Sequence, residues 1–508
     1  MHKAGWIALM LSVAGVLAGR WMTVNVFQGL PHVEDEMAYT WQAEVYAHGV
    51  LTAPSPPDVE EMYVPFVVNH DGQRAAKYPP GWPVVLSFGV RLGERGWVNP
   101  LLGGLAIWLI YRLGSKIFSR GTALLACFLT LTSPFYLILS GCLHSSAFSL
   151  VLSLIFTLAW LDTFDAVGKN GNGSRWPAPK WMTILVAGLS LGLLALTRPL
   201  TAVGVGLPFF IHGLILLVRG NWRGRGQVLA VGGITLAIGT LFLAWQYGVT
   251  GNPFTDPYTL WWPFDKIGFG PGVGIYPGGF TPRIALRDTL IMLRATWEDL
   301  FGWKTYSWLF LPFGIWAMRR KKAAWLALGV FVSLVVAYML YWAQVTRYGP
   351  RYYYEGVPAL AMVSAAGILW LAERAKSGGW RLARLILLGG LVAGLVTYNL
   401  AVYMPKRNIE LYGLYGVYRD KLAPFQSEEA LSYTPALVFV NVGKNFTDYA
   451  QLLQLEDPWS TTPFIFAESV NPVRDSILAS HFPGRQVIYY SPYRAVKFSK
   501  PLWQNKQP

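Results

Sequence analysis

The sequence predicts a polytopic α-helical membrane protein. Of its 508 residues, 53% are hydrophobic and only 14% are charged, whereas soluble domains usually carry about 25% charged residues. Apolar runs of the roughly 20 residues needed to cross a bilayer recur along most of the chain. The two cysteines, Cys127 and Cys142, are too few for a disulfide scaffold or a cysteine-based metal site.

Eleven apolar segments are expected to span the membrane as helices. The first is interpreted as a retained anchor rather than a cleaved signal peptide, because Arg20 and Trp21 stand where a cleavage site would have small residues. Together the segments predict a transmembrane domain over residues 1–404. They lie near residues 6–27, 98–116, 121–139, 146–163, 181–197, 201–218, 227–247, 305–318, 323–343, 356–373 and 384–404.

Basic residues are concentrated in alternate connections between these segments. By the positive-inside rule these connections are cytoplasmic, and Lys3 places the N-terminus on the same side of a prokaryotic plasma (inner) membrane. The net charge of +15 is then a topology signal, since a nucleic-acid-binding surface would group its basic residues on a soluble domain. The connections carry Arg112, Lys116 and Arg120; Lys169, Arg175 and Lys180; Arg219, Arg223 and Arg225; Arg319, Arg320, Lys321 and Lys322; and Arg374, Lys376, Arg381 and Arg384.

The same rule places three long connections and the tail on the outer side. They are residues 28–97, 248–304 and 344–355, followed by residues 405–508. The tail is expected to form a small soluble α/β domain, because PALVFVNVG, PFIFAES and RQVIYYSPY resemble strands and DSILASHF resembles a short helix. It lacks paired acids around a histidine and a glycine-rich phosphate loop, so it is interpreted as a lid or docking module.

Three carboxylates open the first outer connection, in the stretch VEDEMAYTWQAEVYAHG over residues 33–49. Met37, Trp41 and Val45 recur at helical spacing, which predicts an amphipathic helix lying in the membrane interface. One interpretation is that Asp35 caps this helix and complements its dipole. The other is that the carboxylates have a chemical role.

Cations also occur in the outer connections, where the positive-inside rule disfavours them, and such exceptions are candidates for function. AAKYPPGWP contains Lys77, LTRPL contains Arg198, and TRYGPRYYYEG contains Arg347 and Arg351. For each arginine the alternative is a lipid-headgroup anchor or a helix-end ion pair. For the tyrosines at residues 352–354 the alternative is an aromatic belt at the membrane surface.

These motifs, taken in order, resemble the GT-C superfamily of membrane glycosyltransferases, whose members include protein O-mannosyltransferases and the aminoarabinose transferase of lipid A. The resemblance covers residues 1–404, leaves the tail unmatched and implies a GT-C-like transmembrane domain. It is carried by Asp35-Glu36 followed by Tyr39 and Gly49, by Lys77-Tyr78-Pro79-Pro80, by Leu196-Thr197-Arg198, and by Arg351-Tyr352 with Pro358-Ala359-Leu360.

The resemblance implies that a sugar moves from a polyprenyl-phosphate donor to a lipid, glycan or protein acceptor at the outer membrane face. A base must deprotonate the acceptor hydroxyl, and Asp35 takes this role, with Glu36 as the second candidate. Positive charge must meet the phosphate, and a single displacement inverts the anomeric centre. The phosphate-binding candidates are Lys77, Arg198, Arg347 and Arg351, and the substrate-binding candidates are Tyr39, Tyr78, His144 and Tyr352.

Several alternatives stay open at this point. No metal is expected to be obligatory, because basic residues are plentiful on this face, although Asp35 and Glu36 could hold Mg²⁺ or Mn²⁺ on a diphosphate. His144 has the alternative of a purely local hydrogen bond. A secondary transporter would place ionisable residues within the spans, where few acids occur, and a non-catalytic subunit of a membrane assembly could keep the same motifs on an inherited fold.

Overall fold

The computed structural model describes residues 3–164, 179–344, 346–376, 380–443 and 445–501. Two compact units result from the contacts within the chain. The helical unit comprises residues 1–22, 96–242 and 263–409, and the mixed unit comprises residues 23–95, 243–262 and 410–508. Lys169 and Arg175, from one predicted cytoplasmic connection, lie outside the described residues.

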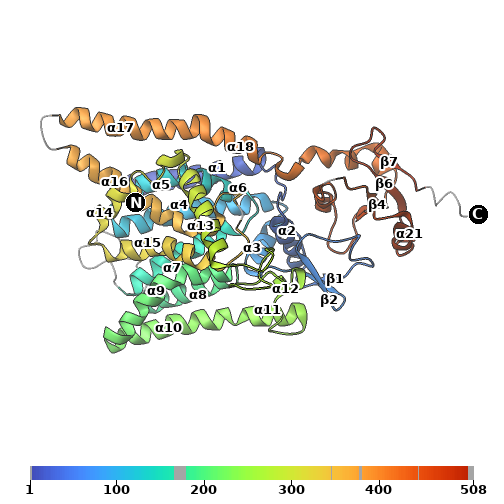
Figure 1. The fold of residues 1–508 in the computed structure, drawn as a ribbon, viewed down its shortest axis with the longest axis horizontal. Helices are drawn as coiled ribbons and strands as arrows, with labels where there is room; N and C mark the ends of the chain where they lie inside the picture. The colour runs from blue at the N-terminus through green and yellow to red at the C-terminus, as the bar shows by residue number, and fades with distance from the viewer. Residues whose placement is uncertain (1–2, 165–178, 345, 377–379, 444, 502–508) are drawn as a thin grey trace, which may run out of the picture. The chain divides into compact units, whose positions relative to one another are not determined.

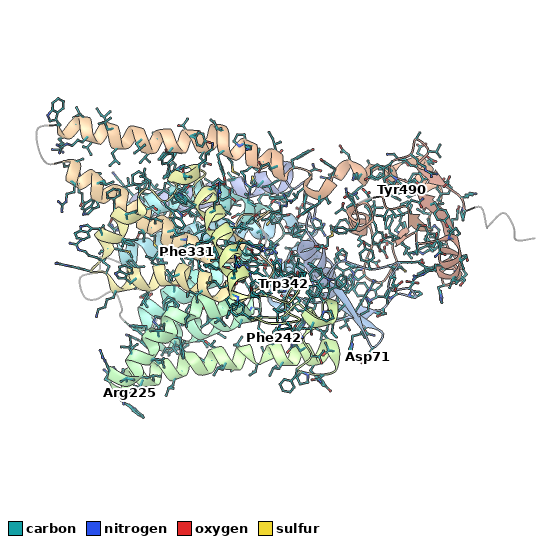
Figure 2. All side chains as sticks on the ribbon, viewed as in Figure 1. Asp71, Arg225, Phe242, Phe331, Trp342 and Tyr490 are labelled. Atoms are coloured by element: carbon teal, nitrogen blue, oxygen red, sulfur yellow. The ribbon has the colours of Figure 1, made fainter. Side chains whose placement is uncertain are left out.

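The helical unit is a bundle in which α7 packs against α4 and α8, α9 against α15, and α16 against α14 (Figure 1). Phe331 of α15, labelled in Figure 2, meets Tyr353 edge-on with ring centroids 6.1 Å apart. The helices lying wholly or mainly in this unit are α1 (Lys3–Asn25), α4 (Val98–Ile117), α5 (Arg120–Leu131), α6 (Pro134–Gly141), α7 (Ser146–Thr163), α8 (Lys180–Ala195), α9 (Pro199–Arg219), α10 (Trp222–Gly239), α13 (Pro282–Asp299), α14 (Leu311–Met318), α15 (Lys322–Tyr338), α16 (Val357–Ala375), α17 (Arg381–Tyr398) and α18 (Met404–Leu411).

Helices cover most of each predicted membrane span. Within the described ranges, six helices are long and apolar enough to cross a membrane, or seven if the bent pair α5 and α6 forms one span. The predicted span near residues 305–318 contains the eight-residue helix α14, because Lys304–Tyr306 form a separate 3₁₀ turn. The structure therefore supports a multi-pass membrane protein, and the count of eleven spans stays a prediction.

The bend of 64° between α5 and α6 has a local cause. Pro134 occupies the first turn of α6, where its missing N–H removes no helical hydrogen bond. The Ser133 hydroxyl accepts from the Tyr136 amide at 3.3 Å, and the Asn399 side chain donates to the Thr132 carbonyl at 2.6 Å. These side chains satisfy backbone groups that the break leaves open, as a nonpolar medium requires.

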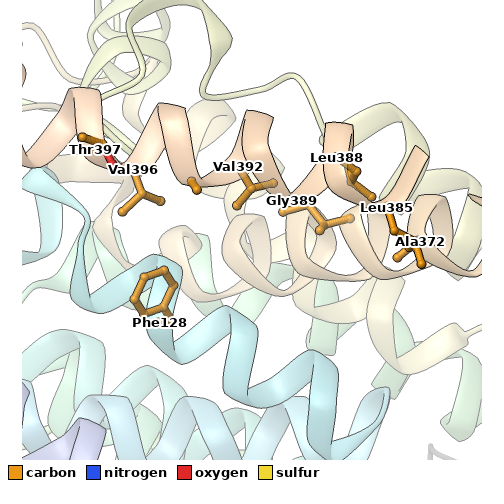
Figure 3. A pocket seen from close by; sticks show the side chains of 10 residues that line it. Phe128, Ala372, Leu385, Leu388, Gly389, Val392, Val396 and Thr397 are labelled. Carbon is orange, nitrogen blue, oxygen red and sulfur yellow. The ribbon is translucent and has the colours of Figure 1, made fainter. Parts of the chain in front are cut away.

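An apolar pocket of about 490 Å³ lies between α17, α16 and Phe128 of α5 (Figure 3). Small and aliphatic side chains of α17 form one wall, and Gly389 has open space around it. Because the lining is apolar, hydrocarbon rather than water is the expected filling of this pocket in a membrane. Its lining residues are Phe128, Ile368, Ala372, Leu385, Leu388, Gly389, Val392, Ala393, Val396 and Thr397.

The mixed unit begins with a helix and a small antiparallel sheet of order β1-β3-β2. The β2–β3 hairpin turns at Asp71 and Gly72 (Asp71 is labelled in Figure 2), whose φ angles are 48° and 74°. Two left-handed residues in a two-residue loop match the twist of the flanking strands. The elements are α2 (Glu34–Ala47), β1 (Ala53–Pro54), β2 (Val67–His70), β3 (Gln73–Ala76), α3 (Gly81–Arg91), α11 (Leu241–Thr250) and α12 (Pro257–Trp261).

A second sheet of the mixed unit, of order β5-β4-β6-β7, comes from the C-terminal segment. Strands form in all three segments predicted to be strands, and β4 pairs in parallel with β5 and β6. Alternate residues of β4 pack into two different hydrophobic clusters, so its apolar run is buried on both faces. The elements are α19 (Glu428–Leu431), β4 (Ala436–Val440), α20 (Thr447–Ala450), β5 (Phe464–Glu468), α21 (Pro472–Ser480), β6 (Gln486–Tyr490) and β7 (Phe498–Ser499).

Arg474 of α21 ties this C-terminal sheet to the first outer connection. Its guanidinium pairs with Asp58 at 2.7 Å, Glu60 at 2.6 Å and Glu61 at 3.2 Å. Arg74 of β3 donates to the carbonyl of Pro458 at 2.6 Å. The tail is thus part of one compact unit with these residues, and an independent domain over residues 405–508 stays a prediction.

We predict that Glu61→Gln reduces the pH dependence of stability in the mixed unit. Burial raises the pKa of Glu61 from 4.5 to about 7, so between these values the folded protein holds a proton that the unfolded chain releases. This contribution to stability is complete below pH 4.5 and is lost as the pH rises through 7. The thermal unfolding midpoint of the full chain in detergent, measured from pH 4.5 to pH 8, should therefore fall less steeply with rising pH in the variant than in wild type.

Glu60→Gln is the matched control, because Glu60 pairs with the same arginine while its side chain is 77% exposed. This variant should keep the wild-type slope of midpoint against pH. Equal slopes in wild type and Glu61→Gln would contradict the prediction.

Candidate functional site

Asp35 lies in the first turn of α2 and is hydrogen-bonded to a tyrosine. The N-cap position of α2 is Val33, with φ −121° and ψ 154°, and no side chain caps the helix there. The interpretation of Asp35 as the cap is therefore wrong. Instead, the Tyr78 hydroxyl donates to Oδ1 of Asp35 at 2.7 Å. Burial, followed by the Asp35 carboxylate, raises the pKa of Tyr78, so the phenol stays protonated and can donate.

Glu36, the second acid of the predicted pair, is fully buried and supports the start of the helix. Its Oε2 accepts from the amide of His32, the residue before the N-cap, at 2.9 Å. Gln42 joins α2 to its surroundings by accepting from the Ala76 amide at 2.7 Å and donating to the Leu51 carbonyl at 3.0 Å. Polar side chains of α2 are thus buried as well as apolar ones. The helix is therefore not buried on its apolar side alone, as the predicted amphipathic helix would be.

The β2–β3 hairpin positions Lys77. The Lys77 amide donates to the Phe66 carbonyl at 2.9 Å, directly beyond the last paired residues, Val67 and Ala76. Pro80 then stands at the N-cap of α3 and cannot contribute a ladder donor. The strand therefore ends directly before the candidate residues Lys77 and Tyr78.

Four aromatic rings surround the Lys77 ammonium and form what we call the aromatic cage. The Nζ atom lies 3.9 Å from the ring centroid of Phe66, 4.6 Å from Trp262, 5.1 Å from Tyr258 and 5.5 Å from Tyr78. All four distances are within the roughly 6 Å range of cation–π attraction. Because Lys77 is only 2% exposed, these rings replace part of the hydration that the charge loses.

The mixed unit thus brings together four residues that the sequence singled out: Asp35, Tyr39, Lys77 and Tyr78. The Tyr39 ring lies 4.7 Å from that of Tyr78, and both side chains are buried. The three other cage residues, Phe66, Tyr258 and Trp262, were not identified from the sequence. Two of them come from a segment about 180 residues further along the chain, and no spacing rule links such positions.

In the helical unit, Arg198 stands at the break between α8 and α9. Pro199 disfavours a helical conformation in the preceding residue, and Arg198 accordingly has φ −148° and ψ 88°. Its guanidinium donates to the Ser146 hydroxyl at 3.3 Å, to Glu355 Oε1 at 3.4 Å and to the Tyr338 hydroxyl at 3.4 Å. We call these residues, with their neighbours Ser149, His144, Arg351 and Tyr352, the Arg198 cluster.

Tyr352 is the aromatic centre of the Arg198 cluster. Its ring stacks on that of Tyr338 with centroids 4.4 Å apart and an interplanar angle of 17°. The guanidinium carbons of Arg198 and Arg351 lie 5.7 Å and 5.4 Å from its centroid. His144 Nδ1 is 2.9 Å from the serine hydroxyl that accepts from Arg198. Four predicted residues, Arg198, Arg351, Tyr352 and His144, therefore lie in one cluster.

Arg347, the remaining phosphate-binding candidate, is held through its main chain. Its carbonyl accepts from Arg407 Nη2 at 3.4 Å, and the same nitrogen pairs with Asp299 Oδ2 at 3.2 Å. The Tyr403 hydroxyl donates to the other oxygen of Asp299 at 2.7 Å. This network holds the backbone of residues 344–355 at Arg347.

Glu355 was noticed in the last predicted outer connection but received no role from the sequence, although a signal was present. It is an acid placed directly before the apolar run of α16, and a carboxylate next to such a run is a functional candidate. For metals, the part of the chain that the structure describes has no group of three or more His, Cys, Asp or Glu side chains that could hold an ion.

Solved membrane glycosyltransferases have a similar fold. The apo oligosaccharyltransferase of Archaeoglobus fulgidus gives a TM-score of 0.57 at 12% identity, over 95% of this chain and 69% of that one. ArnT from Cupriavidus metallidurans, bound to undecaprenyl phosphate, gives a TM-score of 0.57 at 16% identity, over 96% of this chain and 90% of ArnT. The arabinofuranosyltransferase AftD from Mycobacteria gives 0.50 at 13% identity, over 95% of this chain and 35% of AftD.

These three proteins are GT-C glycosyltransferases, so the GT-C-like fold predicted from the order of the motifs is confirmed. No family model and no curated protein sequence matches the chain. Because the identities are between 12% and 16%, the similarity establishes the fold, and the functional roles of individual residues remain predictions.

We predict that the aromatic cage protects Lys77 from amine-modifying reagents. Lys421, in the same unit, is 27% exposed and serves as the internal control. Reductive methylation followed by peptide mass spectrometry should label Lys77 much more slowly than Lys421. Trp262→Ala should raise the labelling rate of Lys77 by about tenfold, because one cation–π contact of about 1–2 kcal/mol is lost, and should leave Lys421 unchanged. Equal rates at Lys77 in wild type and variant would show that the cage does not hold the ammonium.

Proposed function

We propose that this protein is a membrane glycosyltransferase that moves a sugar from a polyprenyl-phosphate donor to an acceptor hydroxyl. The observation that carries the proposal is the hydrogen bond from Tyr78 to Asp35, which links this carboxylate to one of the rings around Lys77 within a GT-C-like fold. A base and a phosphate-binding cation are the two groups that this reaction requires.

Asp35 acts in this proposal as the general base. The acceptor oxygen attacks the anomeric carbon, and its proton passes to the Asp35 carboxylate. The bond from that carbon to the phosphate oxygen breaks, and its electron pair leaves with the phosphate. One displacement on one face inverts the anomeric centre. Glu36 is the weaker candidate, because its Oε2 already accepts from the His32 amide and its side chain is fully buried.

The positive charge comes from Lys77, from Arg198 and from the two arginines of residues 344–355. Lys77 would hold a phosphate oxygen, while Arg198, Arg347 and Arg351 offer guanidinium groups that suit phosphate geometry. Tyr39, Tyr78, His144 and Tyr352 are proposed to contact substrate. Since these cations can neutralise a monophosphate, we propose that no divalent metal is obligatory, and activity should survive EDTA.

The proposed donor, acceptor face and orientation have separate support. ArnT, of similar fold, was crystallised with undecaprenyl phosphate, which is the type of carrier proposed here. The distribution of basic residues supports a multi-pass protein of the plasma (inner) membrane with a cytoplasmic N-terminus and an extracytoplasmic C-terminal segment. The acceptor would then be a lipid, glycan or protein on the outer side.

The decisive experiment is sugar transfer in proteoliposomes from a panel of radiolabelled polyprenyl-phosphate sugars. Asp35→Asn should lower kcat by about 10²–10⁴-fold, the range expected for loss of a general base. Glu34→Gln is the matched control, since Glu34 is an acid of the same helical turn without a proposed role, and it should retain wild-type transfer.

Each alternative outcome has a separate meaning. Equal transfer by wild type and Asp35→Asn would remove Asp35 from the mechanism. Absence of transfer with every donor would favour a transporter or a non-catalytic subunit. Loss of transfer in Glu34→Gln as well would assign the effect to the helix start rather than to one carboxylate.

A further inference from the structure

Glu355 is a buried acid inside a cluster that the proposed function assigns to phosphate binding. Its side chain is 0% exposed, against 8% for Arg198. Both the Ser149 hydroxyl and the Arg198 guanidinium donate to Oε1, whereas Oε2 accepts no hydrogen bond from another described residue. A carboxylate in this setting opposes the binding of any anion to Arg198, so its presence in a phosphate site needs an explanation.

The hydrogen bonds from Arg198 to Ser146, Glu355 and Tyr338 are long enough to be exchangeable. They measure 3.3–3.4 Å, beyond the 2.7–3.2 Å of well-formed bonds. Two of these acceptors, Tyr338 and Glu355, also have closer partners. The Thr201 hydroxyl lies 2.6 Å from the Tyr338 hydroxyl, and the Ser149 hydroxyl donates to Glu355. These three hydrogen bonds can therefore be exchanged for contacts to a phosphate while the acceptors keep other hydrogen bonds.

The charge of the substrate changes during the proposed reaction. The donor is a phosphodiester with one negative charge, and the product is a phosphate monoester with about −1.5 to −2 charges at pH 7. The Arg198 cluster contains two guanidinium groups and one carboxylate, so its formal charge is closer to that needed for the diester. Without Glu355 the same cluster would match the monoester better and would retain the product.

We propose that Glu355 is a positioning residue that competes with phosphate for Arg198 and so favours release of the polyprenyl phosphate product. This inference rests on the proposed function, in which Arg198 binds the donor phosphate. When phosphate leaves, the buried carboxylate draws the guanidinium back, because an unpaired buried charge is unfavourable. Glu355 touches neither the reacting carbon nor the acceptor in this account.

The test measures binding of undecaprenyl phosphate and of its methyl diester to the full chain in nanodiscs at pH 8. Coulomb energy is proportional to charge, so removing the carboxylate should affect the dianion about twice as much, in log affinity, as the monoanion. Glu355→Gln should therefore tighten the monoester about tenfold and the diester about threefold. In transfer assays the same variant should show a matching increase in product inhibition.

Ser149→Ala provides a second test with the opposite sign. Without the serine hydroxyl, Oε1 of Glu355 is left to Arg198 alone, so the ion pair should strengthen and monoester affinity should fall about threefold, the effect of one hydrogen bond. This variant removes only one hydroxyl, and it decides the question if Glu355→Gln does not fold.

Asp162→Asn is the matched control. Asp162 is also an acid paired with a cation, Lys116, with its side chain 9% exposed, but it lies at the opposite end of α7 from Ser149. Thirteen residues of helix separate the two positions by about 20 Å, so both affinities should remain at the wild-type value.

Three results would overturn the inference. They are equal changes for monoester and diester in folded Glu355→Gln, weaker binding of both in that variant, and tighter monoester binding in Ser149→Ala. Absence of sugar transfer by wild type would instead count against the proposed function, because the binding measurements do not depend on turnover.

Discussion

A charge removed from water must be compensated by the protein, and both units are organised around this constraint. In the mixed unit the compensation for Lys77 includes four aromatic rings within 5.5 Å of its ammonium. In the helical unit Arg198 is compensated by Glu355 and by hydroxyl groups. A ring attracts a cation without carrying a negative charge, whereas a carboxylate also repels an incoming phosphate. The two cations are therefore compensated in different ways, and the proposed phosphate ligand would meet a carboxylate at Arg198.

Prolines determine where these charged groups lie. Pro199 ends the helical conformation at Arg198 and places the guanidinium at the start of α9. Pro79 and Pro80 stop the β2–β3 ladder directly after Lys77 and Tyr78. In each case the backbone break and the functional side chain come from adjacent residues. A motif such as LTRP or KYPP therefore specifies a position in the fold as well as a residue type.

The sequence was most informative where one local rule decides the structure. Hydropathy predicted a helix over residues 146–163, and α7 covers the same residues. The run near residues 121–139 was expected to be one helix, yet Ser133 and Pro134 divide it, because a first-turn proline and its serine cap outweigh hydropathy. In the candidate site, Asp35 and Tyr78 were each singled out, but their hydrogen bond depends on how α2 packs beside β3. Trp262 and Tyr258 carry no local signal, since their role exists only through tertiary contact with Lys77.

In the proposed mechanism Tyr78 and Glu355 have similar effects. Tyr78 moderates the base Asp35, and Glu355 moderates the cation Arg198. In this mechanism, the hydrogen bond donated by Tyr78 orients the Asp35 carboxylate and shares its charge while the acceptor proton is transferred. Glu355 would in the same way weaken the proposed binding of phosphate by Arg198. An enzyme gains turnover only from interactions that are stronger in the transition state than with substrate or product. Groups that moderate a base and a cation are therefore as much a part of the proposed chemistry as the base and the cation themselves.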